Sequence, residues 1–200
     1  IGIACAFMVG QRDYKRLFAY SSIENMGILA LGVGLGGLAS YAALFHALNH
    51  ALCKAGLFFL AGNVLRTFGS TIVRDVTGVL RRLPITGVLM TVLFLAIGGA
   101  PPFGPFWSEL MIFQAAMQSN TPWLGPLFLA LLAVGFLGMG GALLSMLQGQ
   151  DPDTPIARPM EPTLSVVTPL AMACGTLALG IAIPPALANV LRQAASMLGG

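Results

Sequence analysis

The chain has 200 residues, of which 56% are hydrophobic and only 8% are charged, and its net charge is +3. Soluble domains use roughly 45–50% apolar and about 25% charged residues, so this composition excludes an ordinary soluble protein and indicates an integral membrane protein. A transmembrane helix needs about 20 mostly apolar residues, whereas a transmembrane β-barrel shows alternating segments of roughly 10 residues. Several stretches have the helical length, so we expect an all-α, polytopic transmembrane helix bundle.

Apolar runs separated by polar or helix-breaking residues predict the membrane spans. In chain order we expect a partial span over 1–10 and full spans over 17–38, 41–65, 85–113, 123–147 and 164–187. The linkers 66–84 and 148–162 are expected to be cytoplasmic. Since the chain opens at Ile1, inside an apolar run and without a basic leader region, we expect a single membrane domain that is part of a longer protein.

The basic residues predict the orientation of the spans. Of the ten lysines and arginines, eight lie in connections on one side of the expected bilayer: Arg12, Lys15, Arg16, Arg66, Arg74, Arg81, Arg82 and Arg158. Because cytoplasmic loops carry an excess of Lys and Arg, this side is expected to face the cytoplasm, with the basic, amphipathic segment 66–84 along the interface. Arg192 lies in the tail on the other side, and Lys54 falls inside a span.

Lys54 lies near the midpoint of the span 41–65, in the stretch LFHALNHALCKAGLFFLAG. A lysine at the centre of a membrane helix costs about 2.5–3.5 kcal/mol on translocon-based scales, so such residues usually have a function. His46, His50 and Lys54 are four residues apart and share one helix face over about 12 Å, with Asn49 at its edge. We predict a line of proton-exchanging groups, and the alternative is that the histidines are hydrogen-bonded packing residues.

Two carboxylates also fall inside predicted spans. Glu24 lies about seven residues into the span 17–38, roughly 10 Å of helix rise. It is expected to be a proton donor or a partner for a buried cation, and the alternative is an interfacial carboxylate that pairs with the basic loop. Glu109 follows GGAPPFGPF, whose glycines and prolines must break the helix 85–113 near 98–105. Broken backbone at membrane depth is tolerated where it is buried in protein or lines a hydrated cavity, so we predict that Glu109 belongs to an ion path rather than to a surface kink.

The remaining reactive residues do not predict catalysis by this chain. Cys5, Cys53 and Cys174 are isolated in apolar runs, without the CxxC spacing of a metal or redox site, and are expected to pack as small hydrophobic residues. Nucleophile–base pairs, metal clusters and phosphate loops are not apparent in the sequence. We therefore expect no catalytic residue, no metal, no cofactor and no nucleic-acid partner.

Three motifs, in this order, resemble those of a known family. DYKRLFAYSSIENMGI, FHALNHALCKAGLFFLAG and GGAPPFGPFWSE are similar to motifs of the proton-conducting, antiporter-like membrane subunits shared by respiratory complex I, Mrp-type cation/proton antiporters and energy-converting hydrogenases. Glu24 within SSIENMG and Glu109 within APPFGPFWSE look most like the hydrogenase branch, in particular component F of hydrogenase-4 and formate-hydrogenlyase-type complexes. An acid at the position of Glu109 also resembles the middle antiporter-like subunit of complex I.

The resemblance implies a role for each of these residues. His46, His50 and Lys54 would be the central proton relay, Glu109 the ionisable group of the second broken helix, and Glu24 an acid of the hydrogenase branch. It also implies other membrane subunits and a peripheral redox arm as partners, in a bacterial cytoplasmic (inner) membrane. The expected function is proton translocation in a hydrogenase-like complex. The alternatives are a complex I subunit, an Mrp-type antiporter and a purely structural anchor.

Overall fold

The computed structural model describes residues 1–149 and 161–198. In these ranges the regular elements are helices, apart from one isolated β-bridge between Asp13 and Ile72. The helices are α1 (Gly2–Met8), α2 (Tyr14–Leu35), α3 (Leu38–Phe68), the 3₁₀ helix η1 (Val73–Asp75), α4 (Val79–Arg82), α5 (Pro84–Ile97), α6 (Gly104–Gln118), α7 (Leu124–Gln148), α8 (Thr163–Ile181) and α9 (Pro185–Met197). The expected all-α class is confirmed.

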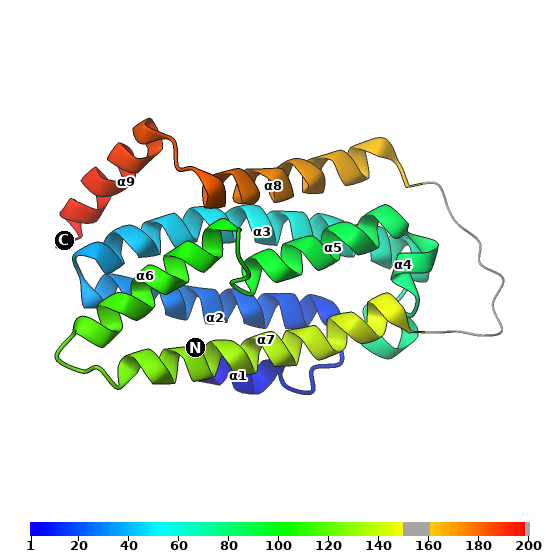
Figure 1. The fold of residues 1–200 in the computed structure, drawn as a ribbon. Coiled ribbons are helices and arrows are strands. Elements are labelled where there is room, and N and C mark those ends of the chain that lie inside the picture. Colours follow the sequence, from blue (N-terminus) through cyan, green and yellow to red (C-terminus); the bar gives the residue numbers. More distant parts are fainter. Residues whose placement is uncertain (150–160, 199–200) are drawn as a thin grey trace.

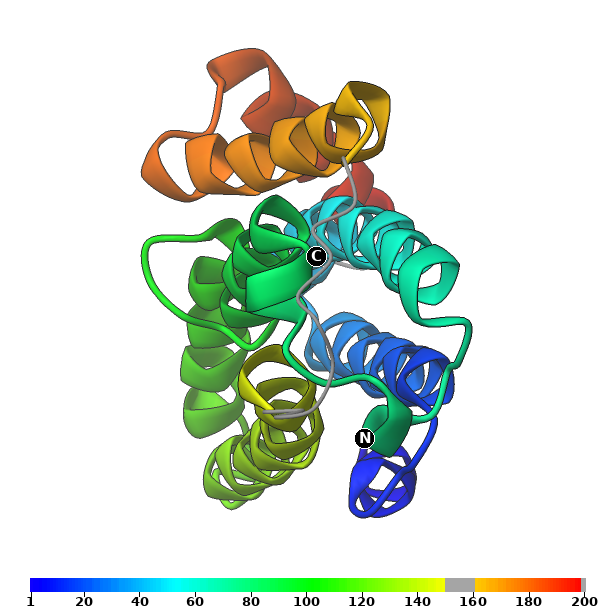
Figure 2. The same ribbon diagram turned by 90° about the vertical axis from the view of Figure 1, so that its right-hand side faces the viewer.

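Four helices in the described ranges, α2, α3, α7 and α8, are long and apolar enough to cross a membrane. Helices α2, α3 and α7 run in roughly the same direction in Figure 1, and α8 crosses them at an angle in Figure 2, with α3 between α2 and α8. Helix α3 contacts α2, α5, α6, α8 and α9. The residues of α3 therefore face protein on most sides, which is the environment that a polar residue in a membrane span requires.

The predicted span 85–113 is two helices, α5 and α6, separated by a break at 98–103 (Figure 1). Gly99 has a φ of 74°, a conformation that favours glycine, and Pro105 lies in the first turn of α6, where its missing N–H is not needed. A side chain at Gly104 would collide with the amide of Asn49. The glycines thus allow the broken backbone to lie directly against α3.

The last predicted span, 164–187, differs from the structure. Helix α8 ends at Ile181 and α9 starts anew at Pro185. Because Pro184 and Pro185 lack an N–H and their rings clash with the preceding turn, they cannot continue the helix. Helix α9 instead bends toward α3, packs against it and buries Ala188, Leu191 and Ala195.

The connections that carry the basic residues meet at one end of the bundle, on the right in Figure 1. We call this end, where Arg12, Lys15, Arg16, Arg66, Arg74, Arg81 and Arg82 lie, the basic end. Arg158 and residues 150–160 of the linker 148–162 lie outside the described residues. That the basic end faces the cytoplasm stays a prediction.

Side-chain caps hold the connections of the basic end in place. Asp13 caps α2 by accepting hydrogen bonds from the backbone N–H groups of Lys15 and Arg16, at 2.9 and 3.0 Å. It also accepts one from the Thr71 hydroxyl at 2.7 Å, which ties the start of α2 to the segment after α3. Glu161 caps α5 through two backbone N–H groups, at 3.0 and 2.8 Å.

Candidate functional site

The three ionisable residues of α3 lie inside the bundle. His46 is fully buried, Lys54 is 5% exposed and His50 is 8% exposed. His46 and Lys54 reach different partners, whereas Nδ1 of His50 is buried without a hydrogen-bond partner among residues 1–149 and 161–198. The helical spacing of four therefore places these residues in the protein interior and not toward lipid.

Lys54 is bound by α2. Its Nζ donates a hydrogen bond to the backbone oxygen of Phe18 at 3.0 Å and a second, short one to the hydroxyl of Ser21. The ring of Phe18 lies beneath the amine, with its centroid 6.0 Å from Nζ. These groups replace part of the hydration that the amine loses in the bundle. They also connect it to a hydroxyl, which can both accept and donate a proton.

His46 is held between α2 and α6 by both ring nitrogens. Nε2 lies 2.9 Å from Oδ1 of Asn25, and Nδ1 lies 2.9 Å from Oγ of Ser108. The amide of Asn25 donates to the backbone oxygen of Ser21 at 2.7 Å, which directs its Oδ1 toward the ring. Nε2 is therefore a donor.

The Ser108 hydroxyl allows His46 to be neutral or protonated. The hydroxyl lies within hydrogen-bond distance of Nδ1 and also 2.8 Å from the backbone oxygen of Pro105. When His46 is neutral, the hydroxyl donates to Nδ1. When His46 is protonated, Nδ1 donates to the hydroxyl, which then donates to Pro105. Rotation of one O–H bond therefore satisfies both states, as a proton relay requires.

Glu24 lies in the interior of α2, 7% exposed, and not beside the basic loop. The thiol of Cys5 on α1 donates to its Oε1 at 3.4 Å. A side chain at Gly135 on α7 would collide with its carboxyl group, so this glycine makes room for the acid. Glu24 interacts electrostatically with Lys54 of α3 and with Glu109 of α6. It is therefore the intermediate group between α3 and α6.

Glu109 lies beside the break and lines two cavities. The inner cavity, of about 20 Å³, is shared with Ser21, Glu24 and Asn25. A cavity needs roughly 10–15 Å³ to hold a water molecule, so about one fits there. The outer cavity, of about 360 Å³, opens between α6 and α7. Glu109 therefore joins the interior to the surface of the bundle.

The adjoining side of α3, which faces α8, has a second, uncharged network. The Thr176 hydroxyl of α8 donates to Oδ1 of Asn49 at 3.0 Å, and the Cys53 thiol points to the same hydroxyl at 3.8 Å. The amide of Asn49 donates to the backbone oxygen of Phe45 at 2.9 Å. This network connects α3 to α8 and, through the contact of Asn49 with Gly104, supports the break.

Sequence reasoning did not single out four of these residues: Ser21, Asn25, Ser108 and Thr176. Ser21 and Asn25 are spaced i−3 and i+1 from Glu24, so a search for polar residues on the face of each buried acid would have found Ser21. Ser108 directly precedes Glu109. Thr176 stands alone in an apolar run and gave no signal.

The cysteines and the acids do not assemble into a metal site in the part of the chain that the structure describes. All three cysteines are free, and Cys5 and Cys53 are buried as expected. Cys174 is exposed on α8, which differs from the packing role expected for it.

Comparison with known proteins places this site in a family. The family described as "NADH:quinone oxidoreductase/Mrp antiporter, TM" matches residues 2–144, which include every residue of the site on α2, α3 and α6. The chain belongs to this family. It is therefore a multi-pass membrane protein, as the apolar helices indicate.

Several known proteins are similar to this chain over most of its length. The hydrogenase-4 component F homolog of Methylacidiphilum infernorum is 40% identical over 135 residues, which are 67% of this chain and 27% of that protein. A chain of the Mrp complex from Dietzia sp. DQ12-45-1b has a TM-score of 0.87 at 21% identity, over 98% of this chain and 45% of its own length. A chain of an archaeal membrane-bound sulfane sulfur reductase has a TM-score of 0.86 at 30% identity, over 98% and 40%. The chain spans about a quarter of the length of the curated relatives it matches.

Proposed function

We propose that this chain conducts protons, as part of a membrane subunit of a hydrogenase-like redox complex in a bacterial inner membrane. The observation that carries the proposal is the buried series from Lys54 through Ser21 and Glu24 to Glu109, which crosses from α3 over α2 to α6. Ionisable groups inside a membrane bundle mark ion pathways and proton relays.

The contacts suggest an order for the transfer. A proton that leaves Lys54 is taken up through the Ser21 hydroxyl, and Glu24 follows one turn later on α2. Glu24 and Glu109 line one cavity with room for about one water molecule, which closes the gap between the two carboxyl groups. From Glu109 the proton leaves through the outer cavity.

The hydrogenase branch is supported by the similarity to a hydrogenase-4 component F homolog and by the acids at Glu24 and Glu109. In such a complex a peripheral redox arm and other membrane subunits are the partners, and this chain holds no redox cofactor. Electron transfer in the arm changes the charge at one end of the line, and the buried groups respond by taking up and releasing protons.

The test is Lys54→Met in the full-length protein inside its complex. Methionine keeps the length of the side chain and removes the exchangeable proton, so we expect proton translocation per electron in vesicles to be lost while electron transfer continues. Lys15→Met is the matched control, because it removes the other lysine of the chain at the basic end. Unchanged translocation in Lys54→Met contradicts the relay.

The same measurements separate the alternatives. An Mrp-type antiporter, one of the two classes named in the family description, exchanges Na⁺ or K⁺ for protons in vesicles that contain no redox arm. A complex I subunit copurifies with NADH:quinone oxidoreductase activity instead of hydrogenase activity. A structural anchor predicts that simultaneous neutralisation of Lys54, His50 and Glu109 leaves coupled activity intact.

A further inference from the structure

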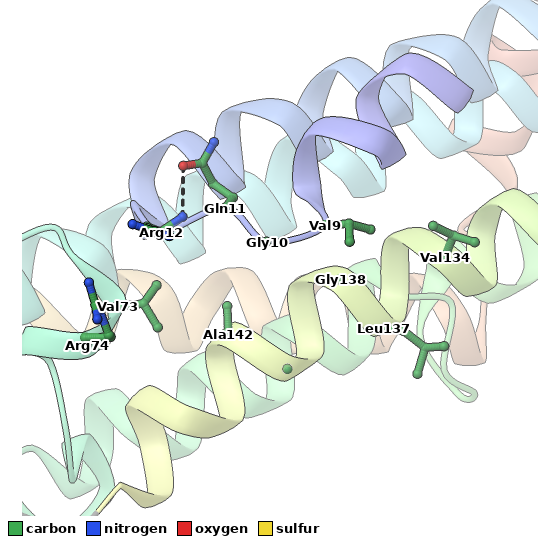
Figure 3. A pocket seen from close by; sticks show the side chains of 11 residues that line it. Val9, Gly10, Gln11, Arg12, Val73, Arg74, Val134, Leu137, Gly138 and Ala142 are labelled. Atoms are coloured by element: carbon green, nitrogen blue, oxygen red, sulfur yellow. Dashed lines mark hydrogen bonds between the residues drawn. The ribbon is translucent and has the colours of Figure 1, made fainter.

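A groove of about 720 Å³ lies at the basic end, between the α1–α2 connection, η1 and α7 (Figure 3). Arg12 and Arg74 form its polar end. Farther along, its walls are apolar and include Val9, Val134 and Leu137. The groove therefore changes from cationic to hydrocarbon along its length.

The two arginines are available to a ligand. Both are exposed, and neither guanidinium has a hydrogen bond or an ion pair within residues 1–149 and 161–198. The Gln11 side chain next to them accepts from the backbone N–H of Arg12 at 3.0 Å and not from its guanidinium. Of the neighbouring acids, Asp13 is engaged in capping α2, and Asp75 accepts a hydrogen bond from Ser70 at 2.7 Å.

The apolar part of the groove is elongated and runs along α7. From Ala142 to Val134, α7 rises roughly 12 Å along the groove. Gly138 and Gly141 leave this face of α7 without side chains, and a Cβ at Gly141 would meet no atom within 4 Å. Leu137 is 71% exposed and Val9 is 60% exposed beside it.

We propose that this groove binds one acidic phospholipid, with its phosphate on Arg12 and Arg74 and one acyl chain along α7. Guanidinium groups bind phosphate through paired hydrogen bonds, and basic pockets between membrane helices hold anionic head groups. An acidic lipid satisfies both ends of the groove. A free phosphate would leave the apolar walls uncovered, and an apolar protein segment would leave both arginines unpaired.

The role of the two arginine charges in lipid binding is tested with the full-length protein purified in its complex. Native mass spectrometry is used to titrate it with dioleoylphosphatidylglycerol and, separately, with dioleoylphosphatidylcholine. We expect the acidic lipid to bind preferentially, and Arg12→Gln with Arg74→Gln to weaken it about 25-fold, at roughly five-fold for each arginine. Arg66→Gln with Arg81→Gln removes the same charge outside the groove and is expected to change nothing.

The role of the open apolar part of the groove is tested with a substitution at Gly141. Gly141→Leu places an apolar side chain in the groove, at a position where a Cβ meets no atom within 4 Å, and is expected to abolish tight binding of phosphatidylglycerol. Gly62→Leu is the matched control. Gly62 also faces open space, and it lies about as far from the last residue of α3 as Gly141 lies from the last residue of α7. If Gly141→Leu fails to fold, the variant with Arg12→Gln and Arg74→Gln still tests the lipid site, because substitutions of two exposed side chains leave the fold intact.

Several results would overturn the lipid site. These are equal binding of phosphatidylcholine, binding of phosphatidylglycerol unchanged by the arginine pair or by a folded Gly141→Leu, and inorganic phosphate binding as tightly as the lipid. Capture of polypeptide instead of lipid by a photo-crosslinking amino acid at position 141 would also overturn the lipid site.

Discussion

Helix α3 has two polar sides that differ in chemistry. Toward α2 and α6 it presents Lys54 and His46, whose partners are hydroxyl, amide and backbone groups next to a cavity. Toward α8 it presents Asn49 and Cys53, which meet a single threonine. One side is ionisable and beside space for water, and the other is neutral.

If the chain conducts protons as proposed, this difference assigns transport to the ionisable side and structural support to the neutral side. A relay needs groups that change protonation state, partners that satisfy both states, and a continuation toward solvent. The side toward α2 and α6 has ionisable groups, partners for both states of His46 and two cavities lined by Glu109, whereas the amide and hydroxyl toward α8 do not titrate in the physiological range. We infer that the α8 side fixes the position of the break, so that Glu109 stays opposite Glu24.

Glu109→Gln is expected to have the largest effect among the changes that distinguish the two sides. The amide keeps the shape of the side chain but cannot carry a proton through the only carboxyl group that lines both cavities in the described residues. The rate of proton translocation is expected to fall at least ten-fold, which corresponds to a barrier raised by about 1.4 kcal/mol or more. Glu161→Gln is the matched control, because it makes the same change at the cap of α5. Equal effects of the two variants would contradict the exit role of Glu109.

Ser108→Ala is expected to have an intermediate effect. Without the hydroxyl, Nδ1 of buried His46 has no partner, and a buried unsatisfied group costs about 1–3 kcal/mol of stability. Translocation is expected to slow several-fold, because the two protonation states of His46 are no longer both satisfied. Ser145→Ala is the control, since Ser145 also donates to the backbone oxygen three residues earlier but lies on the exposed side of α7. A wild-type rate in Ser108→Ala would show that the protonation of His46 takes no part in translocation.

Much of the ionisable side could be predicted from the sequence, because it depends on local rules. The spacing of His46, His50 and Lys54 fixes a common helix face, and the Gly/Pro stretch before Glu109 requires a break. The cost of placing a charge in hydrocarbon then requires that this face be turned toward protein. These arguments need no knowledge of which helices are neighbours.

The partners could not be predicted in the same way. Asn25 is 21 residues from His46, and Thr176 is 127 residues from Asn49. Such pairs depend on how the helices assemble, which periodicity does not encode. The end of α8 at Ile181 was missed for a different reason, since the apolar run continues to Leu187 and hides the effect of Pro184 and Pro185.

Thr176→Val tests the neutral side and is expected to have a smaller effect. It removes the hydrogen bond to Asn49 at nearly constant volume, and interhelical hydrogen bonds in membrane proteins contribute about 0.6 kcal/mol on average. We expect a thermal unfolding midpoint lower by a few degrees and an unchanged number of protons per electron. Thr168→Val, an exposed threonine of the same helix, is the control for the change in side chain. A loss of translocation without a loss of stability would place the α8 side in the path.

Asp13 gives the smallest expected effect and extends the comparison to an ionisable group outside the spans. Burial raises the pKa of its carboxyl group, but hydrogen bonds from Thr71 and from the N–H groups of Arg16 and Lys15 outweigh this and hold the pKa below its ordinary value of 3.8. The folded state therefore binds this proton less tightly than the unfolded state. The stabilisation is complete above the unfolded pKa and is lost as the pH falls through the folded pKa.

Asp13→Asn keeps a side-chain oxygen for the helix cap and removes the titration. The free energy of unfolding, measured between pH 6 and pH 3, is expected to fall less steeply at the acid end than in the wild type. Asp75→Asn removes an exposed carboxylate of the same end and serves as the control. Proton translocation at neutral pH is expected to be unchanged in both variants, because a carboxylate held by fixed donors at a helix start stabilises the fold and stands apart from the line of Lys54, Glu24 and Glu109. Slower translocation in Asp13→Asn would contradict this and would indicate that the proton path includes Asp13 at the basic end.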